Sequence, residues 1–464
     1  MFTRYSFVLT LCALSLSAVS GCSDDPAPAS DAGAQDVGAA RDTGADAGTD
    51  VGTVDVLQVD IPLLTDAPLV DLGPLDAGAG DAATRDASAD AAGDAGAGDA
   101  GAGCALTRGF LTTSDFSAGG YALATLSPPA LMALSAMSPD QDHVPVVSGC
   151  QVFTMLRGND VLAVLDGANL PAVTRQIPLR PAGIDGGAGP YQVNPYDVEV
   201  VAPNKAFVSQ YARASLAIVD PTLSGSAAVT GSVDLSPVRA SADNDPSGAP
   251  EASELLRVGN TLYVVLQNLA SYAPVANGSV ALVDTATNAL LDADPSAPGT
   301  QAIALTVRNP VSAALAGDTL VVAGAGVQAF QPPQMLDGAI ESVSLATRRP
   351  TGQRVTEAAL GGDLQSIVMT GNTTGYALVY QLGDGGTRSA RVVAFDLAAG
   401  TAGRTLHSGA DIGAIARDPN GAIWVLDRSP TNGGVYVYRE DGRALTTAPL
   451  STGALPPYGI AFTP

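Results

Sequence analysis

The residues with the most distinctive chemical spacing form an acidic loop near the middle of the chain. Asp243, Asp245, Ser247 and Gly248 are followed by two glutamates, in the order of oxygen-bearing positions that calcium loops use. Calcium takes several hard oxygen ligands on a tight turn, so the spacing predicts a calcium site. Pro250 and the lack of flanking helical patterns place this loop between strands, and a solvated acidic loop is the alternative interpretation. The predicted ligands are Asp243, Asp245, Ser247, Glu251 and Glu254.

A second set of polar and aromatic residues stands where short apolar runs begin or end. If these runs are strands whose ends meet around an axis, their side chains would form a polar mouth for a small molecule, a glycan or a peptide. Strand ends are also polar because water reaches them, and this is the alternative. The set comprises Asp115, Arg157, Tyr196, Asp197, Gln210, Tyr211, Gln267, Asn268, Gln381, Asp427, Arg428 and Tyr458.

Residue patterns for catalysis are weak. His143 and His407 are isolated in the sequence, and we find no zinc-binding histidine pair, Gly-x-Ser-x-Gly turn or phosphate-binding glycine loop. We therefore expect a binding or scaffold protein rather than an enzyme. A calcium-dependent hydrolase or lactonase is the alternative.

The N-terminus carries export signals. Arg4 precedes an apolar stretch from Phe7 to Val19, which is too short to span a membrane stably, and the sequence then reads Val19-Ser20-Gly21-Cys22. These four residues resemble the lipobox of bacterial lipoproteins. The resemblance implies that residues 1–21 are a signal peptide and that Cys22 carries the lipid. With Ser23 next, it also implies a cell-envelope location at the outer membrane, facing the periplasm or the exterior.

Residues 22–103 form a low-complexity segment rich in Asp, Ala and Gly. Between residues 23 and 103 there are 17 Asp and two Arg, so this segment carries more of the net charge of −24 than the rest of the chain. Such a composition buries too little apolar surface to order itself, and like charges extend it. We expect a disordered tether between a lipid anchor and a globular head. The acidic balance argues against nucleic-acid binding.

From residue 104 onward the chain consists of short apolar runs separated by Gly, Asn, Asp and Pro, as is typical of antiparallel strands. One run recurs with a final Asp, at Leu162–Asp166, Leu216–Asp220, Val280–Asp284 and Val392–Asp396. A second apolar strand and a tight turn precede most copies. The units start near residues 143, 195, 254, 310, 363 and 411. A period of about 50 residues made only of strands predicts a β-propeller.

The ends of this region complement each other. Tyr458–Phe462 looks like a first strand with nothing after it, whereas Gly109–Thr113 and Tyr121–Leu126 look like second and third strands without a first. Pairing them would complete one more blade and remove an open sheet edge. We therefore predict an all-β fold with seven four-stranded blades over residues 104–464. Six or eight blades are the alternatives.

Two stretches, Asn260–Val265 and Val280–Thr287, resemble the YVTN-type (YncE-like) propeller repeat of bacterial envelope proteins. The resemblance implies a seven-bladed propeller outside the cytoplasm and no single activity. Cys104 and Cys150 are two thiols in an exported protein, so we expect a disulfide between them. The sequence thus predicts a lipid-anchored envelope protein whose propeller binds an unidentified protein, glycan or small molecule.

Overall fold

The computed structural model describes residues 108–180, 192–240, 248–328, 333–383 and 386–463. The predicted signal peptide, the lipid-bearing Cys22, the tether over residues 22–103 and Cys104 lie outside the described residues. The disulfide between Cys104 and Cys150 therefore stays a prediction. No helix in the described part of the chain is both long and apolar enough to cross a membrane.

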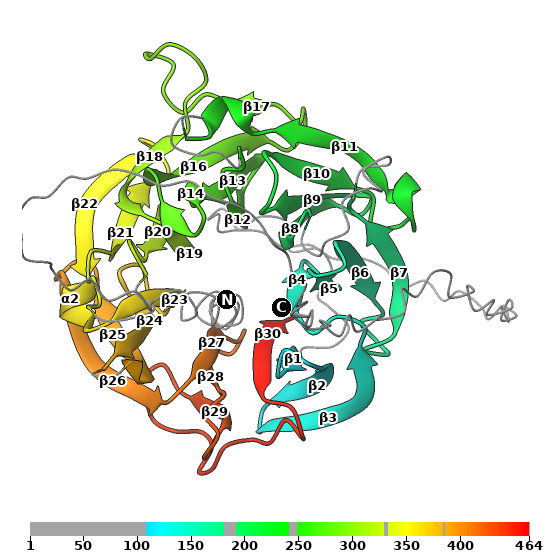
Figure 1. Cartoon of the computed structure of the whole chain (residues 1–464), viewed down its shortest axis with the longest axis vertical. Coiled ribbons are helices and arrows are strands. Elements are labelled where there is room, and N and C mark those ends of the chain that lie inside the picture. The colour runs from blue at the N-terminus through cyan, green and yellow to red at the C-terminus, as the bar shows by residue number, and fades with distance from the viewer. Residues whose placement is uncertain (1–107, 181–191, 241–247, 329–332, 384–385, 464) are drawn as a thin grey trace, which may run out of the picture. The chain divides into compact units, whose positions relative to one another are not determined.

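The chain forms seven antiparallel sheets arranged as the blades of a propeller around a central axis (Figure 1). This confirms the predicted fold class and blade number. Each blade begins with an inner strand that contacts the inner strands of the neighbouring blades. From blade 1 to blade 7 the inner strands are β30 (Pro457–Phe462), β4 (His143–Ser148), β8 (Pro195–Ala202), β12 (Ala252–Val258), β19 (Pro310–Ala316), β23 (Asp363–Met369) and β27 (Ile412–Arg417).

The second and third strands fill the middle of each blade and are buried at most positions. The second strands are β1 (Gly109–Ser114), β5 (Gln151–Leu156), β9 (Lys205–Gln210), β13 (Thr261–Leu266), β20 (Thr319–Gly324), β24 (Thr374–Leu382) and β28 (Ile423–Asp427). The third strands are β2 (Gly119–Leu126), β6 (Val161–Leu165), β10 (Ser215–Val219), β16 (Asn277–Asp284), β21 (Ala339–Ser344), β25 (Arg388–Asp396) and β29 (Gly434–Tyr438).

The outer strands vary most. Blade 4 divides this position between two strands and inserts a small hairpin, and blade 7 has only isolated bridges at Leu450 and Ala444. Blade 7 therefore has three regular strands and only bridges at the position of the fourth. The outer elements are β3 (Pro129–Ser138), β7 (Val173–Pro178), β11 (Val229–Asp234), β17 (Leu290–Leu291), β18 (Ile303–Arg308), β22 (Arg349–Thr356) and β26 (Thr401–Gly409), with the hairpin β14 (Leu269–Ala270) and β15 (Ala273–Pro274).

Three short helical segments connect strands in the described part of the chain, and the sequence pattern did not predict them. They are η1 (Ser226–Ala228), η2 (Ser236–Val238) and α2 (Glu357–Leu360). The hydroxyl of Thr356 caps the last of these by accepting the backbone N–H of Ala359.

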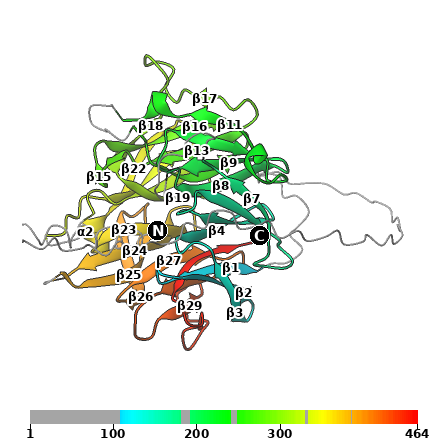
Figure 2. The ribbon, with the colours of Figure 1, turned by 45° about the vertical axis from the view of Figure 1, so that its right-hand side comes forward.

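Blade 1 is assembled from both ends of the head, as the orphan strands predicted. Strand β30 pairs antiparallel with β1, with Gly109 opposite Phe462 and Leu111 opposite Ile460. Figures 1 and 2 show β30, in red, beside β1, in cyan, from two directions. The pairing joins residues about 350 positions apart and closes the circle of blades.

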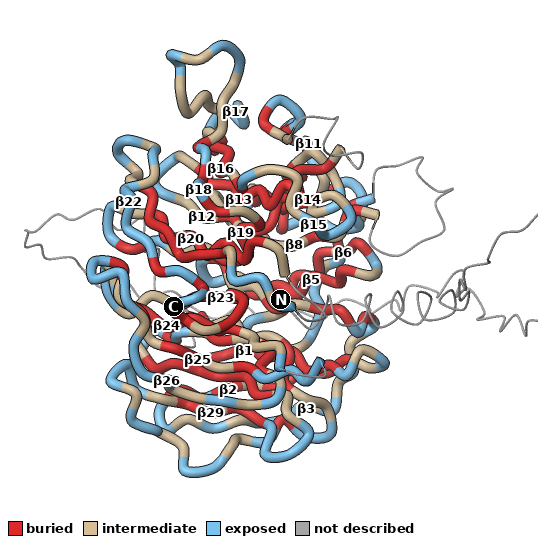
Figure 3. Tube along the Cα trace, turned by 60° about the vertical axis from the view of Figure 1, so that its left-hand side comes forward, coloured by how far each residue is buried: buried red, intermediate tan, exposed pale blue. Residues whose placement is uncertain are grey.

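The core consists of seven apolar clusters, one between each pair of neighbouring blades. Leu262 and Val264 of β13 face blade 3, whereas Tyr263 faces blade 5. Side chains alternate between the two faces of a strand, so burial of both faces requires a continuous apolar run. Figure 3 shows buried residues along the middle of the blades and exposed residues at their connections.

The Asp that recurs after the third strand holds a turn. Oδ1 of Asp166 accepts the backbone N–H of Ala168, and Asp220, Asp284 and Asp396 each accept the N–H two residues further on. These contacts lower the pKa of Asp166, mainly through Asn169, and of Asp284, mainly through the N–H of Thr287. The repeated Asp therefore serves the fold rather than a binding site.

Candidate functional site

The inner strands surround an open cavity of about 390 Å³ on the propeller axis. Six of the seven blades contribute to its wall. Apolar residues are the larger part of the wall, and the described residues that line it include no Arg, Lys or His. The lining residues are Val144, Val146, Tyr196, Asp197, Glu254, Leu255, Leu256, Ser312, Ala313, Ser366, Ile367, Gly413, Ala414 and Ile415.

Two carboxylates from neighbouring inner strands line this cavity, and each accepts a backbone N–H from the inner strand of the next blade. Asp197 Oδ2 accepts the N–H of Leu255 at 2.8 Å, and Glu254 Oε2 accepts the N–H of Ala313 at 2.5 Å. An inner strand has a free edge toward the axis, so its N–H groups need acceptors from elsewhere. Asp197 and Glu254 supply these acceptors.

Hydroxyl groups make the same kind of bridge in two other blades. Ser148 Oγ accepts the N–H of Val200, and Ser312 Oγ accepts the N–H of Ile367. Side chains thus link inner strands across four successive blade boundaries, from β4 to β23. Two of these links are carboxylates and two are neutral, so the acidic character of the axis is concentrated at Asp197 and Glu254.

Burial raises the pKa of both axial carboxyl groups. The pKa of Asp197 is raised to about 7, with the nearby Glu199 adding to the effect, and that of Glu254 is raised to about 8, with Asp197 adding to it. Their backbone hydrogen bonds act in the opposite direction. Near neutral pH this cavity therefore holds carboxyl groups poised between the acid and the carboxylate.

The predicted mouth residues share one face of the propeller, since a second strand ends where the antiparallel first strand begins. At this face Arg157 pairs with Asp142 at 3.1 Å, and the Tyr458 hydroxyl donates to Asp142 at 2.7 Å. Tyr458 and Arg157 are buried. Their polar groups are therefore used to join blades 1 and 2.

A stacked pair of tyrosines extends this network over blade 3. The rings of Tyr196 and Tyr211 lie 5.2 Å apart, and the Arg157 guanidinium lies 4.9 Å from the Tyr196 ring centre. The Tyr211 hydroxyl donates to Gln267 Oε1 at 2.7 Å, which reaches blade 4. Both tyrosines remain partly exposed, and Tyr196 also lines the axial cavity.

On the other side of Tyr458 the network continues through Arg428. Its guanidinium lies 5.1 Å from the Phe116 ring centre and 5.6 Å from that of Tyr458, and its Nε donates to Asp411 at 3.3 Å. Asp411 in turn accepts the Tyr380 hydroxyl at 2.8 Å. Contacts at this face thus link blades 1 to 4 with blades 6 and 7.

Sequence reasoning missed Asp142, Asp411, Phe116 and Tyr380. Asp142 and Asp411 directly precede inner strands β4 and β27, so the rule that selected Tyr196 and Asp197 would have found them if it had been applied to every unit. Phe116 follows the end of β1 by two residues, and Tyr380 lies within β24. No local signal marks the last two.

Other predicted mouth residues bind close neighbours instead of meeting at the axis. Asp115 Oδ1 accepts N–H groups of its own turn, and Gln210 Oε1 accepts the Ser215 hydroxyl. Asn268 donates to the Asn277 carbonyl, and Gln381 lies beside Gly361 and Gly362.

Asp427 belongs to a polar cluster between blades 6 and 7. Its Oδ2 lies 2.8 Å from His407 Nε2, and His407 Nδ1 lies 2.9 Å from the Tyr438 hydroxyl. Desolvation raises the pKa of Tyr438 to about 12. This cluster explains both His407 and Asp427 as partners within the fold.

Of the five predicted calcium ligands, Asp243, Asp245 and Ser247 lie outside the described residues. Glu251 Oε2 accepts the N–H of Leu269 at 2.7 Å, whereas Glu254 belongs to β12 and lines the axial cavity. Among the described residues, no group of three or more His, Cys, Asp or Glu is placed to hold a metal ion. Calcium binding stays a prediction.

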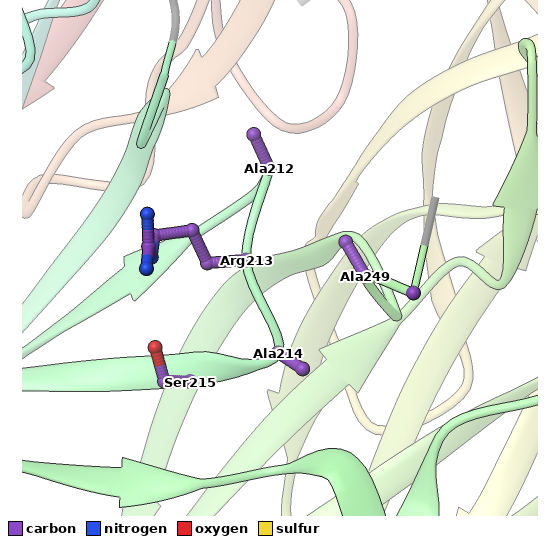
Figure 4. A pocket seen from close by; sticks show the side chains of 6 residues that line it. Ala212, Arg213, Ala214, Ser215 and Ala249 are labelled. Atoms are coloured by element: carbon purple, nitrogen blue, oxygen red, sulfur yellow. The ribbon is translucent and has the colours of Figure 1, made fainter. Parts of the chain in front are cut away.

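A second pocket, of about 320 Å³, lies on the connection between β9 and β10. Figure 4 shows the Arg213 and Ser215 side chains extending to the same side of this connection, with Ala249 across from it. Gly248 and Ala249, which complete its wall, follow directly after residues 241–247, which are outside the described set.

Comparisons with known proteins do not assign this chain to a family. No family model matches the chain, and no curated protein matches it. Solved structures similar to it include Kuenenia stuttgartiensis hydrazine synthase, with 14% identity, TM-score 0.47 and coverage of 67% of this chain and 81% of that one. Pseudomonas aeruginosa periplasmic gluconolactonase has 12% identity and TM-score 0.46, and Citrobacter koseri AztD has 12% and 0.40; each match covers 77% of this chain and 99% of the other.

The axial carboxyl groups predict a pH dependence of stability. The folded chain retains the Asp197 and Glu254 protons to pH about 7 and 8, whereas the unfolded chain loses them near pH 4. Their contribution is therefore complete below pH about 4 and is lost as the pH rises through these folded values. Denaturant titrations between pH 5 and 9 give the free energy of unfolding. This free energy should fall less with rising pH in Glu254→Gln than in the parent protein.

The matched control is Asp234→Asn, which changes an exposed acid of β11. It should follow the parent protein at every pH. Parallel profiles for the parent protein and Glu254→Gln would contradict the assignment, because the Gln amide keeps an acceptor for Ala313 but removes the titration.

Proposed function

We propose that the chain is a lipid-anchored envelope protein whose propeller binds a small organic cation in its axial cavity. The observation that carries this proposal is the pairing of two carboxyl groups with apolar walls in a cavity whose described lining residues include no cationic side chain. An ammonium group beside Asp197 and Glu254 would supply the missing positive charge.

The wall of the cavity favours an organic cation over a bare metal ion. Calcium takes six to eight oxygen ligands, whereas Asp197 already accepts N–H groups with both of its oxygens. Val146, Leu256 and Ala414 line the cavity and are partly exposed, so they offer apolar surface that a hydrated ion does not use. A molecule with an ammonium group and a compact apolar body matches both features.

The mouth supports the same ligand class. Tyr196 lies between the cavity and the stacked Tyr211, and both rings are partly exposed. Aromatic faces attract cations, and because Arg157 already contacts the Tyr196 ring, Tyr211 is the aromatic residue of this pair that an approaching ammonium group would contact.

A hydrolase acting in the same cavity is the second candidate function. The raised pKa values of Asp197 and Glu254 favour it, because enzymes use such groups as general acids near neutral pH. Turnover of a simple lactone that disappears in Glu254→Gln would support the hydrolase. Binding of an amine without its consumption would support the binding module.

Benzylammonium is a suitable probe for the axial cavity. With the full-length protein bearing Cys22→Ser, calorimetry at pH 8 should show binding with a Kd on the order of 1 mM, because the probe is small. The affinity should rise between pH 6 and 8, as the carboxyl groups ionise. Asp197→Asn and Glu254→Gln should each weaken binding at least about tenfold.

Benzyl alcohol, which has the same body without the charge, should bind at least about tenfold more weakly than benzylammonium. Asp234→Asn should leave the affinity unchanged. Equal affinity for the charged and neutral probes, or full binding by Glu254→Gln, would exclude the axial cation site.

The lipid anchor is tested at Cys22. A protein carrying Cys22→Ser should move from the membrane fraction to the supernatant after cell fractionation, because it lacks the thiol that would bear the acyl chains. Ser23→Ala is the matched control and should remain in the membrane. Membrane association of the Cys22→Ser protein would contradict the anchor.

A further inference from the structure

The outer strand of blade 1 differs from the other outer strands in charge and exposure. Strand β3 has ten residues and, among the described residues, pairs only with β2. Residues 117–139 contain no charged residue. The full-length outer strands of blades 2, 3, 5 and 6 each carry at least one charge: Arg175, Asp234, Arg349 with Arg354, and Arg404.

Strand β3 also presents the two most exposed large apolar side chains in the described part of the chain. Met132 is 57% exposed and Met137 is 62% exposed. Leu134 and Ala136 are partly buried against the cluster between blades 1 and 2, so the exposed methionines lie beside a packed apolar surface. Proteins usually protect such an edge with charges or a covering segment.

We infer that β3 is a self-association edge, at which two copies of this chain pair antiparallel about a twofold axis. In such a short pair a charged residue of β3 would lie near its own copy across the axis, so charges of like sign would repel each other. Because β3 has none, it pairs with itself without this repulsion. The charged outer strands of the other blades do not meet this condition.

The geometry of β3 limits the contact. Its register with β2 is regular from Pro129 to Ala133 and shifts before Met137. A regular stretch of about five residues supports a short ladder of main-chain hydrogen bonds with the methionines packed beside it. Such an interface is smaller than a standard stable one, so the dimer should be weak. A twofold contact uses the same surface on both copies, so assembly stops at two.

Sedimentation velocity of the full-length protein bearing Cys22→Ser tests the inference. The average mass should rise from that of a monomer toward that of a dimer between about 10 and 500 μM, as expected for a weak interface. Met132→Lys should remain monomeric over this range, because it places like charges near each other across the axis. Met137→Lys, placed beyond the shift of register, should weaken the dimer less.

Met335→Lys is the matched control, since Met335 is 47% exposed and lies outside blade 1. It should associate as the parent protein does. A parent protein that stays monomeric at 500 μM, association unchanged by Met132→Lys, or mass growth beyond a dimer would each overturn the inference. Unchanged melting temperatures of the variants would show that loss of association is not loss of fold.

Discussion

The structure of the head depends on the pairing of β30 with β1. The other six blades are each built from one continuous stretch of chain, whereas blade 1 needs strands from both ends of the head. The pairing places Tyr458 beside Asp142 and lets the network at the mouth pass from blade 2 to blade 7 through blade 1. An axial cavity surrounded by inner strands also depends on it, because an open arc of blades would not keep its strands around one axis.

A second constraint acts inside the circle. Inner strands expose one edge toward the axis, where water is restricted, and unsatisfied N–H groups there would be costly. The chain satisfies several of them with Ser148, Asp197, Glu254 and Ser312 from the preceding blade. Using carboxyl groups for this task has a consequence, because burial raises their pKa values. Among the described residues that line the cavity, no cationic side chain compensates their charge. The same groups that join the blades thus give the cavity its chemical preference.

Much of the fold could be predicted from the sequence because its determinants are local. The apolar runs, the turn glycines such as Gly259 and Gly317, whose φ angles are positive, and the recurring Asp after the third strand all act within one blade. The outer strands could not be predicted as well, because one of their faces is exposed and the apolar pattern fades there. For this reason the sequence pattern did not indicate that blade 7 has only bridges at its fourth position or that blade 4 inserts the hairpin β14–β15.

The site was predictable only in part. Selecting polar and aromatic residues at strand ends identified Tyr196, Asp197, Tyr211 and Tyr458. This selection could not distinguish a side chain that points to the axis from one that hydrogen-bonds within its own turn, as Asp115 does. Glu254 entered the sequence argument through its spacing from Asp243. Its role at the axis comes from Ala313, which is 59 residues away in the chain and in the neighbouring blade. The site residues are positioned by contacts between blades. The spacing of residues within one blade does not indicate these contacts.

Melting experiments on a shortened chain and on a circularly permuted chain test ring closure most directly. One lacks residues 457–464; the other joins residue 464 to residue 108 and has new ends at the exposed Pro298–Gly299 turn. The account predicts that the joined chain unfolds cooperatively within about 5 °C of the parent protein, and that the shortened chain melts at least about 10 °C lower or without a cooperative transition. A shortened chain that melts like the parent protein would contradict the account.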